Sequence, residues 1–532
     1  MAASVLLSSL PTEVLIRVFV FLATRDIRAC QRVCRFIRDT VQASPMLQYV
    51  LELDTLGYTV PLNPRKDLSY AEKSKLLRTS KAKSTEDTPT PTRIDLEDTG
   101  FMLAKCEFAR GVFVYGPTQD DRLLQKLVVY QFDSINENTP YESWNISVAQ
   151  DMCAYKIDPD QDLLILLRGG PPDDHPNMIT VRELHMCSLK SGNPHPLAVV
   201  PVITPTERIL RSIKDNHFQI VGKYVALLTT DAAFPAEDSL KIFIWDWITG
   251  ELVTMGSVIG DSFVFISESR FIVASGRDSP SEEAVGFLHV YEFDPARLGQ
   301  EACCIASLHL PTTPGDPCCS SPQLVPSPHS LHSFHPAHSA PSLTRPRVYE
   351  LSPNSHYVCI LINVNKIQSY PYEVTRGLLF VPTARILEVT ANHRRCVPWE
   401  QWAKGVYWIN GHLLHCEPKN YIFGPRFAPL IYNYELDLFQ IPVYHLGPSN
   451  RASIEDPLTM MLSKIENAHK YLDRLFLSSG HARRPLLISL ITVPSDVLQT
   501  NRIRPEIMVD DEHIAVHSED QLINYACIPF SL

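Results

Sequence analysis

Residues 221–228 read Val-Gly-Lys-Tyr-Val-Ala-Leu-Leu, and residues 240–252 read Leu-Lys-Ile-Phe-Ile-Trp-Asp-Trp-Ile-Thr-Gly-Glu-Leu. Both are short apolar runs rich in β-branched and aromatic residues, a pattern typical of two strands joined by a polar turn. The same arrangement recurs at residues 269–293 and again at 511–526. This stretch therefore predicts an all-β region built from repeated strand pairs.

The spacing of the repeat predicts the architecture. It returns roughly every 40–55 residues, which suits the four-stranded blades of a β-propeller. Strand-like runs continue over residues 99–532, enough for about six to eight such blades. A double β-sandwich also fits many short strands, but the aromatic-ended repeat favours the propeller.

Two segments interrupt the β pattern. Residues 311–346 are dominated by Pro, Ser and His, so we expect a disordered loop there. Residues 456–478 carry apolar side chains at helical spacing, which predicts a helical insertion. The loop also holds four histidines at every third position, which we attribute to compositional bias rather than to a metal site: His329, His332, His335 and His338.

Residues 4–57 follow a helical period instead. Pro11 suits the first turn of a helix. A run of apolar residues follows it at helical spacing: Val14, Leu15, Val18, Phe19 and Leu22. These residues form both an inward and an outward stripe, and surplus apolar surface on so small a unit indicates a partner.

Two more helices are predicted in this region. One begins at a Thr24 cap and carries an apolar stripe from Ile27 to Ile37. The next begins at Ser44-Pro45 and stops at Gly57. The chain is thus predicted to be a multidomain α+β protein, with a small three-helix unit followed by an all-β propeller. Residues 58–98 are expected to be a linker with one short helix.

The N-terminal residues resemble a known family. Leu10-Pro-Thr-Glu-Val-Leu-Ile-Arg-Val-Phe-Val-Phe-Leu22, then Arg32-Val-Cys-Arg-Phe36 and Ser44-Pro45, match the order and spacing of an F-box. In that family the F-box binds a Skp-type adaptor, which links it to a cullin and a RING subunit. The resemblance therefore implies a substrate receptor of an SCF ubiquitin ligase.

The rest of the chain is similar to fungal F-box proteins that carry a degenerate propeller. The stretches that match are Leu47-Gln-Tyr-Val-Leu-Glu-Leu53, Ala71-Glu-Lys73 and Met508-Val-Asp-Asp-Glu-His-Ile514. Trp245-Asp246 is the sole Trp-Asp pair of the sequence, so residues of true WD repeats that read substrates cannot be carried over.

The resemblance also implies a set of adaptor-binding positions. They are Leu10, Pro11, Leu15, Phe19 and Ile27. Cys30, Val33 and Cys34 are expected to serve the core of the unit instead. No nearby His or second Cys pair completes a metal site with Cys30 and Cys34, so none is predicted.

Composition narrows the class of function. The net charge of −11 argues against a whole-chain nucleic-acid binder. No apolar run approaches the roughly 18 residues of a membrane helix, and no secretory signal is evident. The 13 cysteines form no CxxC pair, which fits reduced thiols in the cytoplasm and/or nucleus.

Signatures of common enzymes are missing from the sequence. It contains no GxSxG elbow, P-loop, GxGxxG, HExxH or EF-hand pattern, so no catalytic residue, cofactor or metal is assigned. We expect a non-catalytic adaptor whose propeller holds an unidentified protein substrate near the ligase. An enzyme built on the propeller and an F-box scaffold that acts outside any ligase remain the alternatives.

Overall fold

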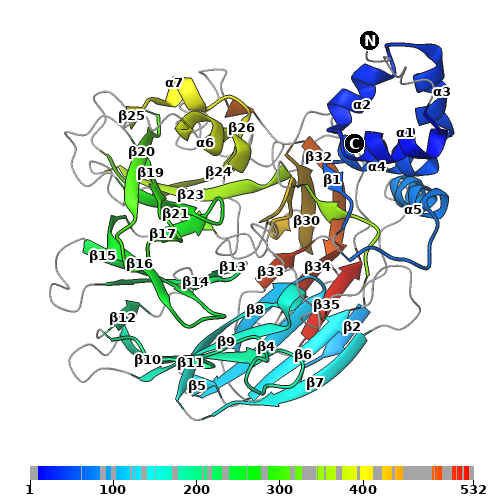
Figure 1. Ribbon diagram of the computed structural model, residues 1–532. Helices are drawn as coiled ribbons and strands as arrows, with labels where there is room; N and C mark the ends of the chain where they lie inside the picture. Colours follow the sequence, from blue (N-terminus) through cyan, green and yellow to red (C-terminus); the bar gives the residue numbers. More distant parts are fainter. Residues whose placement is uncertain are drawn as a thin grey trace. The chain divides into compact units, whose positions relative to one another are not determined.

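The computed structural model divides the chain into two compact units (Figure 1). One comprises Met1–Thr88, Arg345–Ser355 and Ile528–Leu532, and the other Pro89–Thr344 and His356–Cys527. The structure describes residues 10–526 apart from 62, 84–91, 97–103, 120–122, 125, 133–140, 150, 171–177, 207–208, 213–217, 231–238, 261, 277–284, 312–317, 326–342, 344–345, 353–354, 367–373, 392–395, 411–421, 434–437, 447–481, 484–485, 494–505, 511 and 518–520.

The first unit begins with four short helices. They are α1 (Thr12–Val20), α2 (Thr24–Cys30), α3 (Arg35–Ala43) and α4 (Pro45–Thr55). Three helices were expected, and the difference lies between α2 and α3, where residues 31–34 form a turn. The apolar stripe predicted from Ile27 to Ile37 is therefore shared by two helices that both face one core.

The start and the end of α4 follow the sequence signals. The Ser44 hydroxyl accepts a hydrogen bond from the backbone N–H of Leu47, and Pro45 takes the first helical position. Gly57 follows the helix at φ +76°, a conformation that L side chains rarely adopt. Helix α5 (Tyr70–Lys83) comes next, and Ser69 and Glu72 cap its start by exchanging hydrogen bonds.

A segment from much later in the chain completes this unit. Strand β22 (Glu350–Leu351) pairs antiparallel with β1 (Tyr58–Thr59). The Tyr49 hydroxyl donates a hydrogen bond to the carbonyl of Val348. The helical unit is therefore closed by residues that the sequence analysis placed in the propeller, just after the 311–346 loop.

The second unit is a β-propeller of seven blades. Its strands follow one another along the chain, and in Figure 1 the colours run from cyan through green and yellow to red around the ring of this unit. Blade 1 contains β3, β4, β6 and β7 (Ala104–Ala109, Val112–Gln119, Lys126–Phe132, Tyr141–Ser147), and blade 2 contains β8, β9 and β10 (Met152–Asp158, Leu163–Gly170, Met178–Ser188). Blade 3 contains β13 to β16 (Phe218–Val221, Tyr224–Thr230, Ser239–Asp246, Leu252–Ile259). Blade 4 contains β17 to β20 (Ser262–Phe265, Arg270–Gly276, Gly286–Glu292, Cys303–His309).

Three blades complete the ring. Blade 5 contains β21, β23, β24 and β26 (Cys318–Val325, Tyr357–Lys366, Val374–Pro382, Val406–Asn410). Blade 6 contains β27 to β30 and β32 (Ile422–Phe423, Arg426–Phe427, Ile431–Asn433, Leu438–His445, Leu486–Val493). Blade 7 contains β33, β34, β35 and β2 (Glu506–Val509, His513–His517, Gln521–Ala526, Thr92–Asp95).

Short elements supplement the blades. Strands β11 and β12 (Val202–Ile203, Ile209–Ser212) pair with β10, and β5 (Leu123–Leu124) pairs with β4. Strand β25 (Cys396–Val397) runs parallel to β20, and β31 (Ala482–Arg483) runs parallel to β26. Helices α6 (Thr383–Thr390) and α7 (Trp399–Trp402) lie between β24 and β26 in the sequence. Within the described part of the chain, no helix combines the length and apolarity needed to cross a membrane.

The propeller begins earlier than the predicted residue 99. Strand β2 pairs with β35 from Thr92↔Asn524 to Asp95↔Gln521, so an N-terminal strand completes a blade whose other strands come from the end of the chain. Ile94 and Leu96 are buried in a core cluster that also holds Met508. The sequence placed this segment in the linker because a four-residue strand between polar residues has too short a pattern to recognise.

The two predicted insertions have different outcomes. Residues 318–325, inside the loop expected to be disordered, form β21, which pairs with β23 along its whole length. The Ser- and Pro-containing sequence is held there by backbone hydrogen bonds and by the buried Leu324 and Val325. The helical insertion predicted at 456–478 and the four histidines of the loop lie outside the described residues.

Buried polar contacts join the first turns of neighbouring blades. The N–H of Gly111 in blade 1 donates to Asp510 Oδ2 in blade 7 at 2.5 Å. Arg110 Nε lies 3.0 Å from Asp160 Oδ2 in blade 2, and both side chains are almost fully buried. Removing one partner of such a pair would leave an uncompensated buried charge, so these contacts hold blade 1 against its two neighbours.

Candidate functional site

Helix α1 presents apolar side chains on two faces. Leu15 and Phe19 are 0% and 2% exposed and point into the core of the helical unit. Val14 and Val18, one position earlier in each case, are 42% and 45% exposed, and Phe21 at the end of the helix is 89% exposed. Residues at i, i+4 and i+7 share one side of a helix, so these three form an outward apolar stripe.

The core beneath this stripe is complete without a partner. It contains fully or nearly fully buried side chains from all four helices: Leu15, Phe19, Ile27, Ile37, Val41 and Leu47. The outward stripe is therefore surplus to the packing of the unit. An apolar stripe that remains exposed after the core is filled is a typical sign of a binding surface.

Of the five residues predicted to meet the adaptor, three belong to this core. Leu15, Phe19 and Ile27 are brought together inside the unit, Leu10 packs against them, and Pro11 is exposed. Their direct contact with an adaptor stays a prediction. In this structure the buried residues support the outward stripe from beneath, and the stripe itself supplies the accessible surface.

The turn between α2 and α3 adds further exposed apolar residues. Val33 is 74% exposed and Phe36 41% exposed, and Cys34 is exposed as well. The expectation that Val33 and Cys34 serve the core was wrong. The turn at residues 31–34 interrupts the helical period, so positions that a continuous helix would bury face outward instead.

The charge of this region differs from that of the whole chain. Residues 10–44 hold six arginines and three carboxylates, whereas the chain carries −11 overall. Arg28 pairs with Asp54 of α4 at 3.2 Å and donates to the carbonyl of Leu51. All six arginines are exposed, and Arg17 lies on α1 itself, so the positive charge of this unit favours a partner whose own surface is acidic.

Within the propeller, the carboxylates with the most altered pKa are engaged in turns. Burial raises the pKa of Asp158 to about 6, and its side chain accepts hydrogen bonds from Asp160 N and Gln161 Nε2. Burial also raises the pKa of Asp510, but His513 and the backbone N–H groups of Glu512 and Gly111 outweigh it and hold the pKa near 2. Both carboxylates hold the turns in which they lie, Asp158 between β8 and β9 and Asp510 between β33 and β34.

The comparisons with known proteins agree with the division into two units. Residues 7–44 match the model of the F-box-like family. The chain thus combines an F-box-like region with a seven-blade propeller, an architecture that fits an SCF substrate receptor in general and is typical of non-catalytic adaptors. No curated protein gives a significant match to this sequence.

Several solved structures align with a large part of this chain, each at a low TM-score. Sqt1 of Chaetomium thermophilum aligns over 78% of this chain and 79% of its own at 10% identity, with a TM-score of 0.29. AztD of Citrobacter koseri aligns over 80% of this chain and 84% of its own at 8% identity, with a TM-score of 0.30. A mutant apocarotenoid oxygenase of Synechocystis aligns over 69% of this chain and 93% of its own at 10% identity, with a TM-score of 0.31. Similarity at this level does not extend to function.

Proposed function

We propose that this protein is the substrate-recognition subunit of an SCF ubiquitin ligase. Its helical unit docks on a Skp-type adaptor, and through it on the cullin and RING subunits, and its propeller holds a protein substrate. Such a receptor acts in the cytoplasm and/or nucleus. The tethered substrate reaches a high effective concentration beside the ubiquitin-loaded enzyme, so the chain itself needs no catalytic residue.

The observation that carries the proposal is the outward stripe of Val14, Val18 and Phe21 on an F-box-like unit whose own core is already filled. Burying one such side chain at a contact contributes about 1.5–3 kcal/mol before the costs of association. Three of them supply part of the affinity of such an interface, and the exposed arginines of the unit add complementarity to an acidic adaptor surface.

The test compares two triple variants of the full chain, each co-expressed with a Skp-type adaptor. The first is Val14→Ser/Val18→Ser/Phe21→Ser, which removes the stripe and leaves the buried core intact. The second is the matched control Val199→Ser/Ile259→Ser/Leu298→Ser, which removes three exposed apolar side chains of the propeller unit. We expect the wild type and the control to copurify with the adaptor, and the stripe variant to bind at least tenfold more weakly.

Two results would contradict the proposal. One is a wild-type chain that is folded and soluble but recovers no adaptor. The other is a stripe variant that binds as tightly as the control. Substitution of Leu15, Phe19 or Ile27 is less informative, because loss of a buried side chain costs about 2–5 kcal/mol and would unfold a unit of this size.

A further inference from the structure

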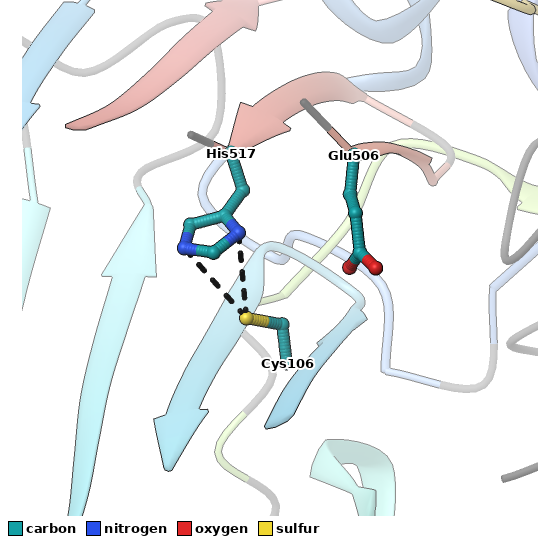
Figure 2. A group of neighbouring side chains, drawn as sticks. All are labelled: Cys106, Glu506 and His517. Carbon is teal, nitrogen blue, oxygen red and sulfur yellow. Dashed lines mark hydrogen bonds between the residues drawn. The ribbon is translucent and has the colours of Figure 1, made fainter. Parts of the chain in front are cut away.

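Three potential metal ligands meet where the first and last blades of the propeller adjoin. They are Cys106 of β3, Glu506 of β33 and His517 of β34, and Figure 2 shows the thiol pointing toward the imidazole ring. Glu506 and His517 are direct partners across the β33–β34 ladder, so their side chains share one face of blade 7. Strands β3 and β33 are both at the edge of their sheet, each the first strand of its blade.

The distances suit a tetrahedral metal ion. Cys106 Sγ lies 3.6 Å from His517 Nδ1 and 3.9 Å from Nε2, so the sulfur faces both ring nitrogens, and a turn of the imidazole would direct one of them at a shared ion. A tetrahedral Zn²⁺ with bonds of about 2.3 Å to sulfur and 2.0–2.1 Å to nitrogen holds the sulfur and the nitrogen roughly 3.5 Å apart. All three ligand atoms lie within 4.8 Å of one another.

The surroundings hold the imidazole in place while leaving the group accessible. His517 is buried against the rings of Phe113 and Tyr115, with centroids 5.9 Å and 5.8 Å away. Cys106 and Glu506 are only half-buried, which gives an ion a path to the group from solvent.

We propose that Cys106, Glu506 and His517 form a binding site for a divalent metal ion of the zinc class. A thiolate, an imidazole and a carboxylate are a ligand set that zinc accepts and that magnesium or calcium does not favour. The ion replaces the thiol proton, which leaves to solvent, and a water molecule fills the fourth position. The site joins blade 1 to blade 7 and so fastens the ring at the point where its two chain ends meet.

Cobalt titration of the purified full chain, stripped of metal by a chelator, tests the site. Co²⁺ bound to a thiolate gives a charge-transfer absorption band that Co²⁺ bound only through nitrogen and oxygen lacks. We expect one Co²⁺ per chain with this band, its displacement by Zn²⁺, and a higher Tm with Zn²⁺ present. Cys106→Ser should abolish the band and lower the affinity for Co²⁺ more than tenfold.

A matched control removes other accessible thiols. Cys303→Ser/Cys304→Ser/Cys396→Ser changes three exposed cysteines of β20 and β25, and it should keep the band at full intensity. A second measurement uses the wild-type chain alone, so its result does not depend on whether a variant folds. Zn²⁺ should slow the alkylation of Cys106, located by peptide mapping, and should not slow that of Cys303.

The proposal is overturned by a wild-type chain that binds no Co²⁺ with a thiolate band. It is equally overturned by a band that disappears in the exposed-cysteine variant and persists in Cys106→Ser, or by alkylation of Cys106 at the same rate with and without Zn²⁺. Because none of these measurements involves the adaptor, their result is independent of the proposed ligase function.

Discussion

Asp510 is a buried carboxylate of blade 7 whose charge we expect to stabilise the propeller. It is fully buried, accepts hydrogen bonds from the N–H groups of Gly111, Glu512 and His513, and lies 3.4 Å from His513 Nδ1. Asp510→Asn keeps the shape of the side chain but removes its charge. Hydrogen bonds to a charged group contribute about 1.5–3 kcal/mol, so we expect a lower Tm at pH 7, measured by thermal denaturation beside the exposed control Asp95→Asn.

The pH dependence of this stabilisation has a definite sign. The pKa of Asp510 is about 2 in the folded chain and about 3.9 in an unfolded one. A carboxylate with a depressed folded pKa stabilises fully above pH 4 and loses its contribution as the pH falls toward 2. The difference in Tm between wild type and Asp510→Asn should therefore shrink over that interval. A difference that stays constant from pH 7 to pH 2 would contradict the assignment.

At the level of single residues, the sequence shows which positions are apolar better than it shows which way each side chain points. Helical spacing showed that α1 carries two apolar stripes, and the structure confirms an inward and an outward one. The resemblance to an F-box assigned Leu15 and Phe19 to the adaptor, whereas the structure buries them. Neighbouring positions such as Val14 and Leu15 differ only in the direction that tertiary packing gives them. Cys106 and His517 lie too far apart in sequence for any local pattern to pair them.

Among the structural elements, β2 is short but completes a whole blade of the propeller. Its four residues complete blade 7, and Ile94 is buried against the core of that blade. Ile94→Ala should cost about 2–5 kcal/mol and should speed hydrogen exchange in β35, the strand with which β2 pairs. Arg93→Ala, on the exposed side of the same strand, should leave that exchange unchanged. Equal protection of β35 in both variants would contradict the role given to β2.

Elements with strong local signals could be predicted, and those held by distant partners could not. Ser44-Pro45 and Gly57 predicted the start and end of α4, because capping depends on neighbouring residues. Strand β21 has no such signal, since its Ser- and Pro-rich sequence forms a strand through pairing with β23. Strand β22 closes the helical unit although nearly three hundred residues separate it from β1.

For the whole molecule, the position of β2 makes a prediction about domain boundaries. A chain that begins at residue 89 keeps all four strands of blade 7, whereas one that begins at residue 99, the boundary predicted from sequence, lacks β2. Both chains lack the F-box-like helices, so any effect of losing those helices is the same in the two. Burial of Ile94 and Leu96 contributes roughly 1.5–3 kcal/mol each to the stability of the folded chain, and the shorter chain loses this contribution.

We therefore expect the shorter chain to melt at a lower temperature and to be cut sooner by protease near β35. Thermal denaturation and limited proteolysis of the two chains measure this. Equal melting temperatures and equal resistance would show that the propeller does not depend on its N-terminal strand.

The architecture as a whole was predictable because it repeats. Strand pairs that recur along the chain indicated a propeller, and seven blades lie within the predicted six to eight. The closure of the ring was not predictable, because it pairs the two ends of the propeller sequence. The sequence predicts no particular surface for the proposed substrate, because the segments between the strands carry no periodic signal.

The most direct measurement of the central claim is a reconstitution of the full chain with a Skp-type adaptor and a cullin–RING pair, followed by size-exclusion chromatography. A substrate receptor should elute in one complex with all of these proteins at equal stoichiometry, and the Val14→Ser/Val18→Ser/Phe21→Ser variant should elute apart from them. A chain that binds the adaptor but excludes the cullin would instead be a scaffold that acts outside the ligase. A folded chain that elutes alone would contradict the account at its first step.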